Sequence, residues 1–476
     1  MYRPVFLFAL LIGVHTTQLS ADTSQWLRII TPHFEMYTTN DQSTSLRELQ
    51  WLEKARSFFI EHGGMDNVTG GGCVRVIAFR SEQEYRLYQP GTDAFAYYER
   101  GRRCDYLVLS DIHPEHYSAA VHEYTHFIID HAGLTLPLWL NEGLADVYSS
   151  LELGDGKAIL GAPLSDRLYV LATKRWLPLE ALFSIDRDSP DYNQSDRAQI
   201  FYAESWALVH MLKFASGYTQ HFSRFLEGIV SGHAPPDALQ LAFGKTMQQI
   251  YSDLQVYCRL IPNHMIAIDL PVSVQDLPVQ ISEPSDLEVR MMMAHVLAAN
   301  PSKTEQARKM LERIAVEYPK SAEPEELLGY LAWQQHDPKQ ARFHFAAAIA
   351  RGSRDARMMA DYAAIELATG GTKAEALALL EKALAVDPDN YDVRLHLGLL
   401  AASQKQPELG ISALTGLKQL RPADAFPVLI ALAYLQVQCH DLQCARRYAE
   451  KAIEYARGPD QHAAAQRILA YASNPD

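Results

Sequence analysis

A repeat of 34 or 35 residues runs through the C-terminal part of the chain and constrains its fold strongly. Small residues recur at this spacing, and the position twelve residues later is a proline in three of five units. Alanine and leucine are frequent in this part, and a proline ends a helix. The sequence therefore predicts a regularly repeated array of helices from about Asp286. The recurring small residues are Ala307, Ala341, Ala376, Gly410 and Ala445, and the later positions are Pro319, Ser353, Pro388, Pro422 and Arg457.

The pattern resembles the tetratricopeptide repeat, which has a period of 34, small residues at the helix crossing and a terminal proline. This resemblance implies a superhelix over residues 287–476, with a concave face that binds proteins or peptides. An unrelated helical bundle is the alternative fold, although bundles carry no such long period. Residues 271–286 contain three prolines and are expected to form an extended linker.

The preceding part of the chain mixes strand-like and helix-like segments. Residues 33–39 alternate as a half-buried strand does, and residues 45–62 place apolar side chains at helical spacing. Residues 73–79 and 105–110 are further candidate strands, and 202–215 is the clearest later helix. We therefore expect an α+β domain with a small N-terminal sheet over residues 22–270, followed by the all-α repeats.

The N-terminus has the layout of a secretory signal peptide. Arg3 precedes an apolar run from Val5 to Val14, and small residues follow before Asp22. The run is about half of the roughly 20 residues that span a bilayer. A cleaved segment, residues 1–21, is therefore favoured over a membrane anchor, with a buried N-terminal helix as the structural alternative. This predicts an exported bacterial protein, periplasmic or secreted, with no transmembrane segment after cleavage.

Net charge and cysteine content bear on partners and compartment. The 476 residues carry a formal net charge of −14 and no basic run, which argues against nucleic acid because phosphate binding needs clustered Lys and Arg. In an exported chain some of the five cysteines can pair. Cys73 with Cys104 and Cys439 with Cys444 are the plausible pairs.

One short segment, AAVHEYTHFIIDHAGLTLPLWLNEGLADVYSS (119–150), carries the candidate chemistry. His122 and His126 are four residues apart, so on a helix they lie about 40° apart and one turn along, and both imidazoles can reach one point. Neutral imidazole binds Zn²⁺ well, and HExxH on a helix is the metallopeptidase pattern. Glu123 projects beside the metal, where it can accept a proton from the attacking water and return it to the leaving amine.

A second helix, expected after the breaker at 131–137, supplies further ligands. Catalytic zinc takes three protein ligands, and the Glu142 carboxylate completes the set. Asp146, four residues later on the same face, is placed to accept the free N–H of a ligand histidine. Gly143 and Ala145 are small, so we expect this helix to lie close against the first.

HEYTH followed by WLNEGLAD resembles the gluzincin metallopeptidases, whose pattern is HExxH, a short connection, then NExxxD. It is most similar to the peptidase-MA-like domains that precede tetratricopeptide repeats in exported bacterial proteins, over most of residues 25–215. The resemblance implies a zincin-like fold, with Zn²⁺ held by His122, His126 and Glu142, Glu123 as general base, and Asp146 behind the ligands. The 15 residues between His126 and Glu142 are somewhat fewer than in thermolysin-like enzymes.

Two further features of the active site remain open at this level. Tyr202 is the candidate to stabilise the oxyanion, because aromatic hydroxyls do so in related enzymes, and His210 is a second candidate. An interfacial tyrosine and a core histidine are the ordinary alternatives. The strands at 73–79 and 105–110 either line the cleft and pair with an extended substrate or are plain core.

These observations predict an exported zinc-dependent metallopeptidase that hydrolyses peptide bonds, with a protein partner on the concave face of its repeats. The alternative is a non-catalytic periplasmic repeat scaffold carrying a degenerate zincin fold. A purely structural zinc is disfavoured, because such sites are normally closed by four Cys or His ligands.

Overall fold

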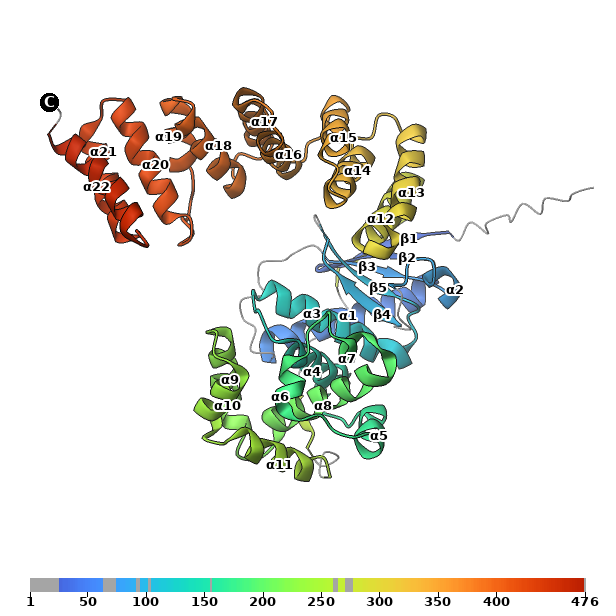
Figure 1. Cartoon of the computed structure of the whole chain (residues 1–476). Coiled ribbons are helices and arrows are strands. Elements are labelled where there is room, and N and C mark those ends of the chain that lie inside the picture. The colour runs from blue at the N-terminus through green and yellow to red at the C-terminus, as the bar shows by residue number, and fades with distance from the viewer. Residues whose placement is uncertain are drawn as a thin grey trace, which may run out of the picture. The chain divides into compact units, whose positions relative to one another are not determined.

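The computed structural model describes residues 25–62, 74–90, 95–101, 104–154, 156–259, 264–269 and 277–474 (Figure 1). The segment expected to be a signal peptide, residues 1–21, lies outside them. The chain divides into two compact units, Met1–Ser285 and Asp286–Asp476.

A six-stranded mixed sheet organises the N-terminal unit. Its strands lie in the order β4-β5-β3-β2-β1-β9. The neighbours β2, β3 and β5 are parallel, whereas β4, β1 and β9 pair antiparallel with their neighbours. The parallel strands are rich in apolar residues, as strands covered on both faces must be. The bounds are β1 Leu27–Ile30, β2 Phe34–Thr38, β3 Val74–Ala78, β4 Ala96–Glu99, β5 Asp105–Leu109 and β9 Gln280–Ser282.

Of the two alternatives for the candidate strands, the structure favours an interior position in the sheet. The candidate strands at 73–79 and 105–110 are β3 and β5, which each have a strand on both sides, so neither offers a free edge to an extended peptide. The two edge strands are β4 and β9, neither of which the sequence analysis identified. Strand β9 falls within the segment expected to be a linker and pairs with β1.

Helices make up most of the rest of this unit (Figure 1). The long helix α1 (Gln42–His62) packs against β2, and α3 (Tyr117–His131) packs against β4 and β5. A second sheet has the strand order β6-β7-β8. The remaining elements are α2 Glu82–Tyr85, η1 Pro114–His116, α4 Leu138–Ser149, β6 Glu152–Leu153, β7 Lys157–Leu160, α5 Ser165–Thr173, α6 Leu179–Ser184, α7 Pro190–Asn193, α8 Ser195–Phe214, η2 Thr219–His221, α9 Phe222–Val230, α10 Pro235–Phe243, α11 Met247–Tyr257 and β8 Ile266–Asp269.

Gly143 sets the approach of α4 to α8 rather than to α3. A Cβ atom at Gly143 would overlap the Ser205 carbonyl oxygen and lie 2.6 Å from Val209 Cγ2, both on α8. Helix α4 does contact α3, but the expectation that Gly143 permits this approach was wrong, because the glycine faces α8. Because glycine has no side chain, the long helix α8 can pack closely against α4 at this position.

The C-terminal unit is an array of helix pairs (Figure 1). The second helices of the pairs begin at Thr304, Pro338, Lys373, Pro407 and Leu442, at the 34- or 35-residue interval of the sequence repeat. The small residues of the repeat are buried where the helices cross, and a Cβ atom at Gly410 would lie 2.7 Å from Leu435 Cδ1. The elements are α12 Asp286–Ala299, η4 Pro301–Lys303, α13 Thr304–Glu317, α14 Glu323–Gln334, α15 Pro338–Ala350, α16 Ala356–Ala368, α17 Lys373–Val386, α18 Tyr391–Ser403, α19 Pro407–Thr415, α20 Ala425–Gln438, α21 Leu442–Glu454 and α22 Pro459–Ser473.

The turns inside four of these pairs share one backbone conformation. His336, Gly370, Lys405 and His440 occupy equivalent positions, and each has a positive φ, of 60°, 86°, 56° and 60° respectively. Glycine adopts this left-handed conformation readily, whereas other residues adopt it at a cost. Three of the four turns therefore hold a strained residue.

Cysteine pairing is described for four of the five cysteines. Cys258, Cys439 and Cys444 are free, so the bridge considered between Cys439 and Cys444 does not form. Cys104 is disulfide-bonded, and its expected partner, Cys73, lies outside the described residues. Over the described part of the chain, none of the helices has both the length and the apolar character needed to cross a membrane.

Candidate metal centre

Two consecutive helices bring the candidate ligands together. Helix α3 carries His122, Glu123 and His126 and ends at His131, after which Gly133 takes a left-handed conformation with φ of 68°. Pro137 caps α4, which carries Glu142. The breaker sequence thus folds the chain back, so that the two helices lie in contact.

The three expected ligands converge on one point. Glu142 Oε2 lies 3.4 Å from His122 Nε2 and 3.6 Å from His126 Nε2. Zinc–ligand bonds of about 2.0–2.1 Å in a tetrahedral arrangement place neighbouring ligand atoms roughly 3.3 Å apart. Two imidazole nitrogens and one carboxylate oxygen at these separations form a donor set that fits a zinc ion.

The outer nitrogen of each imidazole is held by a polar side chain of α4. His122 Nδ1 lies 3.0 Å from Asp146 Oδ1, and His126 Nδ1 lies 2.7 Å from Asn141 Oδ1. When each Nδ1–H donates to its oxygen, the lone pair of Nε2 is left facing the common point. Such partners fix the tautomer and orientation of a metal-binding histidine.

The charges of the centre are mutually coupled. Burial lowers the pKa of His122, but hydrogen bonds to Asp146 and Glu142 outweigh burial and raise it well above the ordinary 6.5. Burial raises the pKa of Glu142, and hydrogen bonds from both histidines outweigh that effect and lower it. The charged forms of Glu142 and the two imidazoles therefore stabilise one another, and a metal cation bound there would compete with protons for the imidazole nitrogens.

Glu123 lies beside the ligands and is anchored to the sheet. One of its carboxylate oxygens is within 4.8 Å of ligand atoms of His122 and His126. Its Oε2 accepts the backbone N–H of Tyr98, on the edge strand β4, at 2.8 Å. Burial raises the pKa of Glu123 above 4.5, which suits a group that must accept a proton near neutral pH.

A cavity of about 520 Å³ opens in front of these residues. Strand β4 lines it, together with the cations Arg100 and Arg187 and the phenols Tyr192 and Tyr202. The Tyr192 hydroxyl donates to Glu142 Oε1 at 3.3 Å and is hydrogen-bonded to Tyr202. Burial raises the pKa of Tyr192 to about 12 and raises that of Tyr202 further, so both phenols keep their protons.

His210, the second candidate for oxyanion stabilisation, lies in the core instead. Its Nε2–H donates to the Gly161 carbonyl at 3.0 Å, and its Nδ1 accepts from the Tyr257 hydroxyl at 2.8 Å. Burial lowers its pKa to about 4. A neutral histidine with both nitrogens engaged in the core has no group left to offer a substrate.

A second group of possible ligands, Asp105, Asp130 and His131, lies near the cavity with ligand atoms within 4.8 Å of one another. The Tyr98 hydroxyl donates to both carboxylates at 3.0 Å, and Arg100 pairs with Asp130 at 3.1 Å. The acidic charges are therefore already partnered. Asp130 belongs to this group and not to the group formed by His122, Glu123 and His126.

Three supporting residues were not identified from the sequence. Asn141 precedes Glu142 within the recognised motif, so its position could have been read there. Arg167 on α5 ion-pairs with Asp146 at 2.7 Å, and its guanidinium carbon lies 5.3 Å from the Tyr202 ring centroid. Arg167 and Tyr192 lie outside the motif in sequence, and tertiary folding brings them to Asp146 and Glu142.

Comparisons with known proteins find likenesses only among solved structures. No protein-family model and no curated protein matches the chain. YrrB, described as a TPR protein with an unusual peptide-binding site, is 15% identical over 39% of this chain and 92% of its own, with a TM-score of 0.32. PilF of Pseudomonas aeruginosa is 19% identical over 39% and 88%, with a TM-score of 0.28. PilW, a type IV pilus biogenesis factor, is 20% identical over 40% and 88%, also with a TM-score of 0.28. The chain is therefore similar in fold to tetratricopeptide proteins. Identities and TM-scores this low assign it no function.

Proposed function

We propose that the N-terminal unit is a zincin-like, zinc-dependent peptidase domain and that the repeat unit binds protein or peptide partners. The observation that carries the first part is the convergence of His122 Nε2 and His126 Nε2 on one oxygen of Glu142 at 3.4 and 3.6 Å. The array of helix pairs supports the second part, because stacked pairs present an extended binding surface.

The chain's own residues have distinct tasks in this proposal. His122, His126 and Glu142 hold the zinc, which when bound supplies positive charge to polarise the scissile carbonyl and to acidify the attacking water. Glu123, held by the Tyr98 N–H, accepts the proton of that water and passes it to the leaving amine. Asp146 and Asn141 keep the imidazoles in place.

Tyr202 is proposed to stabilise the oxyanion, with Tyr192 beside it. Both hydroxyls lie in the cavity wall next to Glu142 and keep their protons. A phenol that donates to the developing oxyanion contributes about 2–4 kcal/mol in comparable sites. We therefore expect Tyr202→Phe to lower kcat strongly with little change in metal content.

Two variants distinguish the loss of bound zinc from the loss of peptide hydrolysis. Glu123→Gln should keep bound zinc and the fold but lose hydrolysis of a mixed peptide library, whereas His122→Ala should lose the zinc itself. Elemental analysis and chelator-sensitive cleavage by the full chain measure the two effects. Full activity in Glu123→Gln would refute the mechanism.

A non-catalytic repeat scaffold is the second candidate. YrrB, one of the similar solved structures, is described as a TPR protein with a peptide-binding site. This candidate predicts partner binding without chelator-sensitive cleavage. Zinc at the centre with no turnover of any peptide would favour it over the first proposal.

A further inference from the structure

One helix of the repeat array ends early. Helix α19 has 9 residues, whereas α17 and α21 have 14 and 13. Because α19 begins at the regular repeat position, it stops about one turn or more before its counterparts do. Residues 416–424 then form an irregular loop, and α20 begins at Ala425.

Arg394 on α18 occupies the place of the absent turn. Its guanidinium lies where a Cβ atom of Gly416 would be. One of its terminal nitrogens also approaches the carbonyls of Ser412 and Ala413, in the last turn of α19, at 3.4 and 3.5 Å. A cation at the C-terminal end of a helix stabilises that end. The early end of α19 is therefore built into the fold by Arg394 and Gly416.

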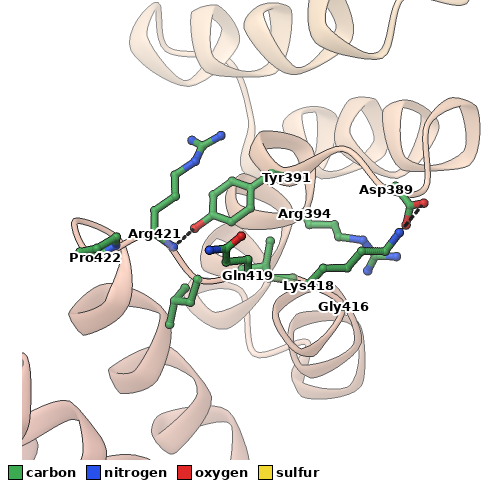
Figure 2. Close-up of a pocket in the computed structure, with 10 residues that line it drawn as sticks. Asp389, Tyr391, Arg394, Gly416, Lys418, Gln419, Arg421 and Pro422 are labelled. Atoms are coloured by element: carbon green, nitrogen blue, oxygen red, sulfur yellow. Dashed lines mark hydrogen bonds and ion pairs between the residues drawn. The ribbon is translucent and has the colours of Figure 1, made fainter. Parts of the chain in front are cut away.

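The shortened helix leaves a cavity of about 480 Å³, called here the α19 cavity (Figure 2). Its charged lining is Arg394, Lys418 and Arg421 against a single carboxylate, Asp389. A chain with a net charge of −14 thus gathers three cations around one opening. Tyr391 and Leu420 add apolar surface to the same wall.

The Arg421 guanidinium is oriented by stacking on an aromatic ring. Its guanidinium carbon lies 3.9 Å from the centroid of the Tyr391 ring. The Tyr391 hydroxyl accepts the backbone N–H of Arg421 at 3.2 Å (Figure 2). It donates to Asp424 at 3.0 Å. A guanidinium stacked on a fixed ring loses less freedom when it binds a carboxylate through two parallel hydrogen bonds.

The present partners of these cations are replaceable. Lys418 pairs with Asp389 at 2.9 Å, and Arg421 pairs with Asp392 at 2.7 Å, and in both pairs each side chain is more than half exposed. Exposed pairs of this kind contribute about 0–1 kcal/mol. A peptide carboxylate can therefore displace Asp389 and Asp392 from these pairs when the adjoining peptide residues become buried in the cavity.

We propose that the α19 cavity binds a carboxylate of an acidic peptide segment, with Arg421 and Lys418 as its two contacts. The proposal rests on the proposed partner-binding role of the repeat unit and not on peptidase activity. It names the place on the array and the chemistry of what binds there.

Fluorescence anisotropy with the full chain tests this proposal. The probe is a labelled peptide of alternating glutamate and alanine, and its matched control replaces glutamate by glutamine. The glutamate peptide should bind, and Arg421→Gln or Lys418→Gln should each weaken binding about tenfold, the loss expected for one charged contact. Arg446→Gln should leave binding unchanged, because Arg446 pairs with Glu450 on α21 and does not line the cavity.

Each other outcome overturns the assignment. Equal binding of both peptides, unaffected by the variants, would place the peptide site elsewhere while leaving partner binding by the repeats intact. Displacement of the peptide by an equal concentration of inorganic phosphate would reassign the cavity to small anions. No binding of the glutamate peptide would refute the proposal. None of these three results would bear on the hydrolysis test above. Lys418 is more than three-quarters exposed, so its variant remains informative if Arg421→Gln perturbs the loop.

Discussion

Arg167 and Asp146 form a two-point ion pair behind His122, one of the two histidines proposed to bind zinc. Arg167 Nε lies 2.7 Å from Asp146 Oδ2, and a second guanidinium nitrogen lies 3.2 Å from Oδ1. Asp146 is almost fully buried, and its Oδ1 also meets His122. Burial raises the pKa of Asp146, but the charge of Arg167 and the hydrogen bond from His122 outweigh burial and lower it.

Arg167→Met should weaken zinc binding without unfolding the chain. The variant leaves a buried carboxylate with one partner fewer, so His122 loses part of the support that orients it. Loss of such an outer partner typically costs about 10–100-fold in metal affinity. Calorimetric titration of the metal-free protein with zinc measures the change. Arg86→Gln, which removes an exposed pair with Glu82, is the matched control, and equal losses in the two variants would contradict a specific role for Arg167.

Lys405→Gly should stabilise the repeat unit. Lys405 has a φ of 56° in a turn whose equivalent residue in the preceding pair is Gly370. Relief of left-handed strain at a non-glycine residue gains about 1–2 kcal/mol, and the added chain entropy of glycine returns part of it. We expect a net gain of about 0.5–1 kcal/mol in urea unfolding followed by circular dichroism. Gly370→Ala is the converse change and should destabilise, and a gain in both variants would show that turn strain is not the cause.

Gly143→Ala should destabilise the N-terminal unit. The new methyl group would overlap the Ser205 backbone carbonyl, which cannot rotate away as a side chain can. Overpacking of this kind costs about 1–3 kcal/mol. Trp139 and Trp206, on the two helices that meet here, are buried and report the change by fluorescence in denaturant. Gly154→Ala, whose Cβ atom would have only an ordinary contact at 3.7 Å, should be near neutral.

Most elements whose formation depends on a local sequence pattern were predicted from the sequence. The 34- or 35-residue interval located the second helices of the pairs, because small residues at helix crossings are a local requirement. The edge strand β4 (Ala96–Glu99) was missed, because four residues carry too little alternation to be recognised. The early end of α19 was also missed, because Arg394, which lies beside Gly416 at that end, comes from the preceding helix.

The candidate site divides in the same way. His122, His126 and Glu142 were placed from one motif, because two consecutive helices carry them. Arg167 and the Tyr98 N–H come from elements tens of residues away. Gly143 was assigned to the wrong neighbour, because a small residue in sequence does not say which helix approaches it.

Glu48 gives the N-terminal unit a pH-dependent stability. It is 1% exposed on α1, and burial raises its pKa from 4.5 to about 8, against the opposing effect of the Tyr117 hydroxyl. Between these two pH values the folded chain holds one proton more than the unfolded chain. Its contribution is therefore fully present below pH 4.5 and is lost as the pH rises through 8, at about 1.4 kcal/mol per pH unit.

Glu48→Gln should remove this dependence, because the amide does not titrate. We expect the free energy of unfolding of the variant to fall less steeply between pH 5 and pH 8 than that of the parent chain, by at most about 1.4 kcal/mol per pH unit. Tryptophan fluorescence isolates this unit, since Trp333 is the only one of the six tryptophans in the repeats. Some slope should remain, because burial also raises the pKa of Glu204 to about 8. Glu115→Gln, on the exposed turn before α3, should keep the parent slope, and an unchanged slope in Glu48→Gln would mean that Glu48 is ionised in the folded chain.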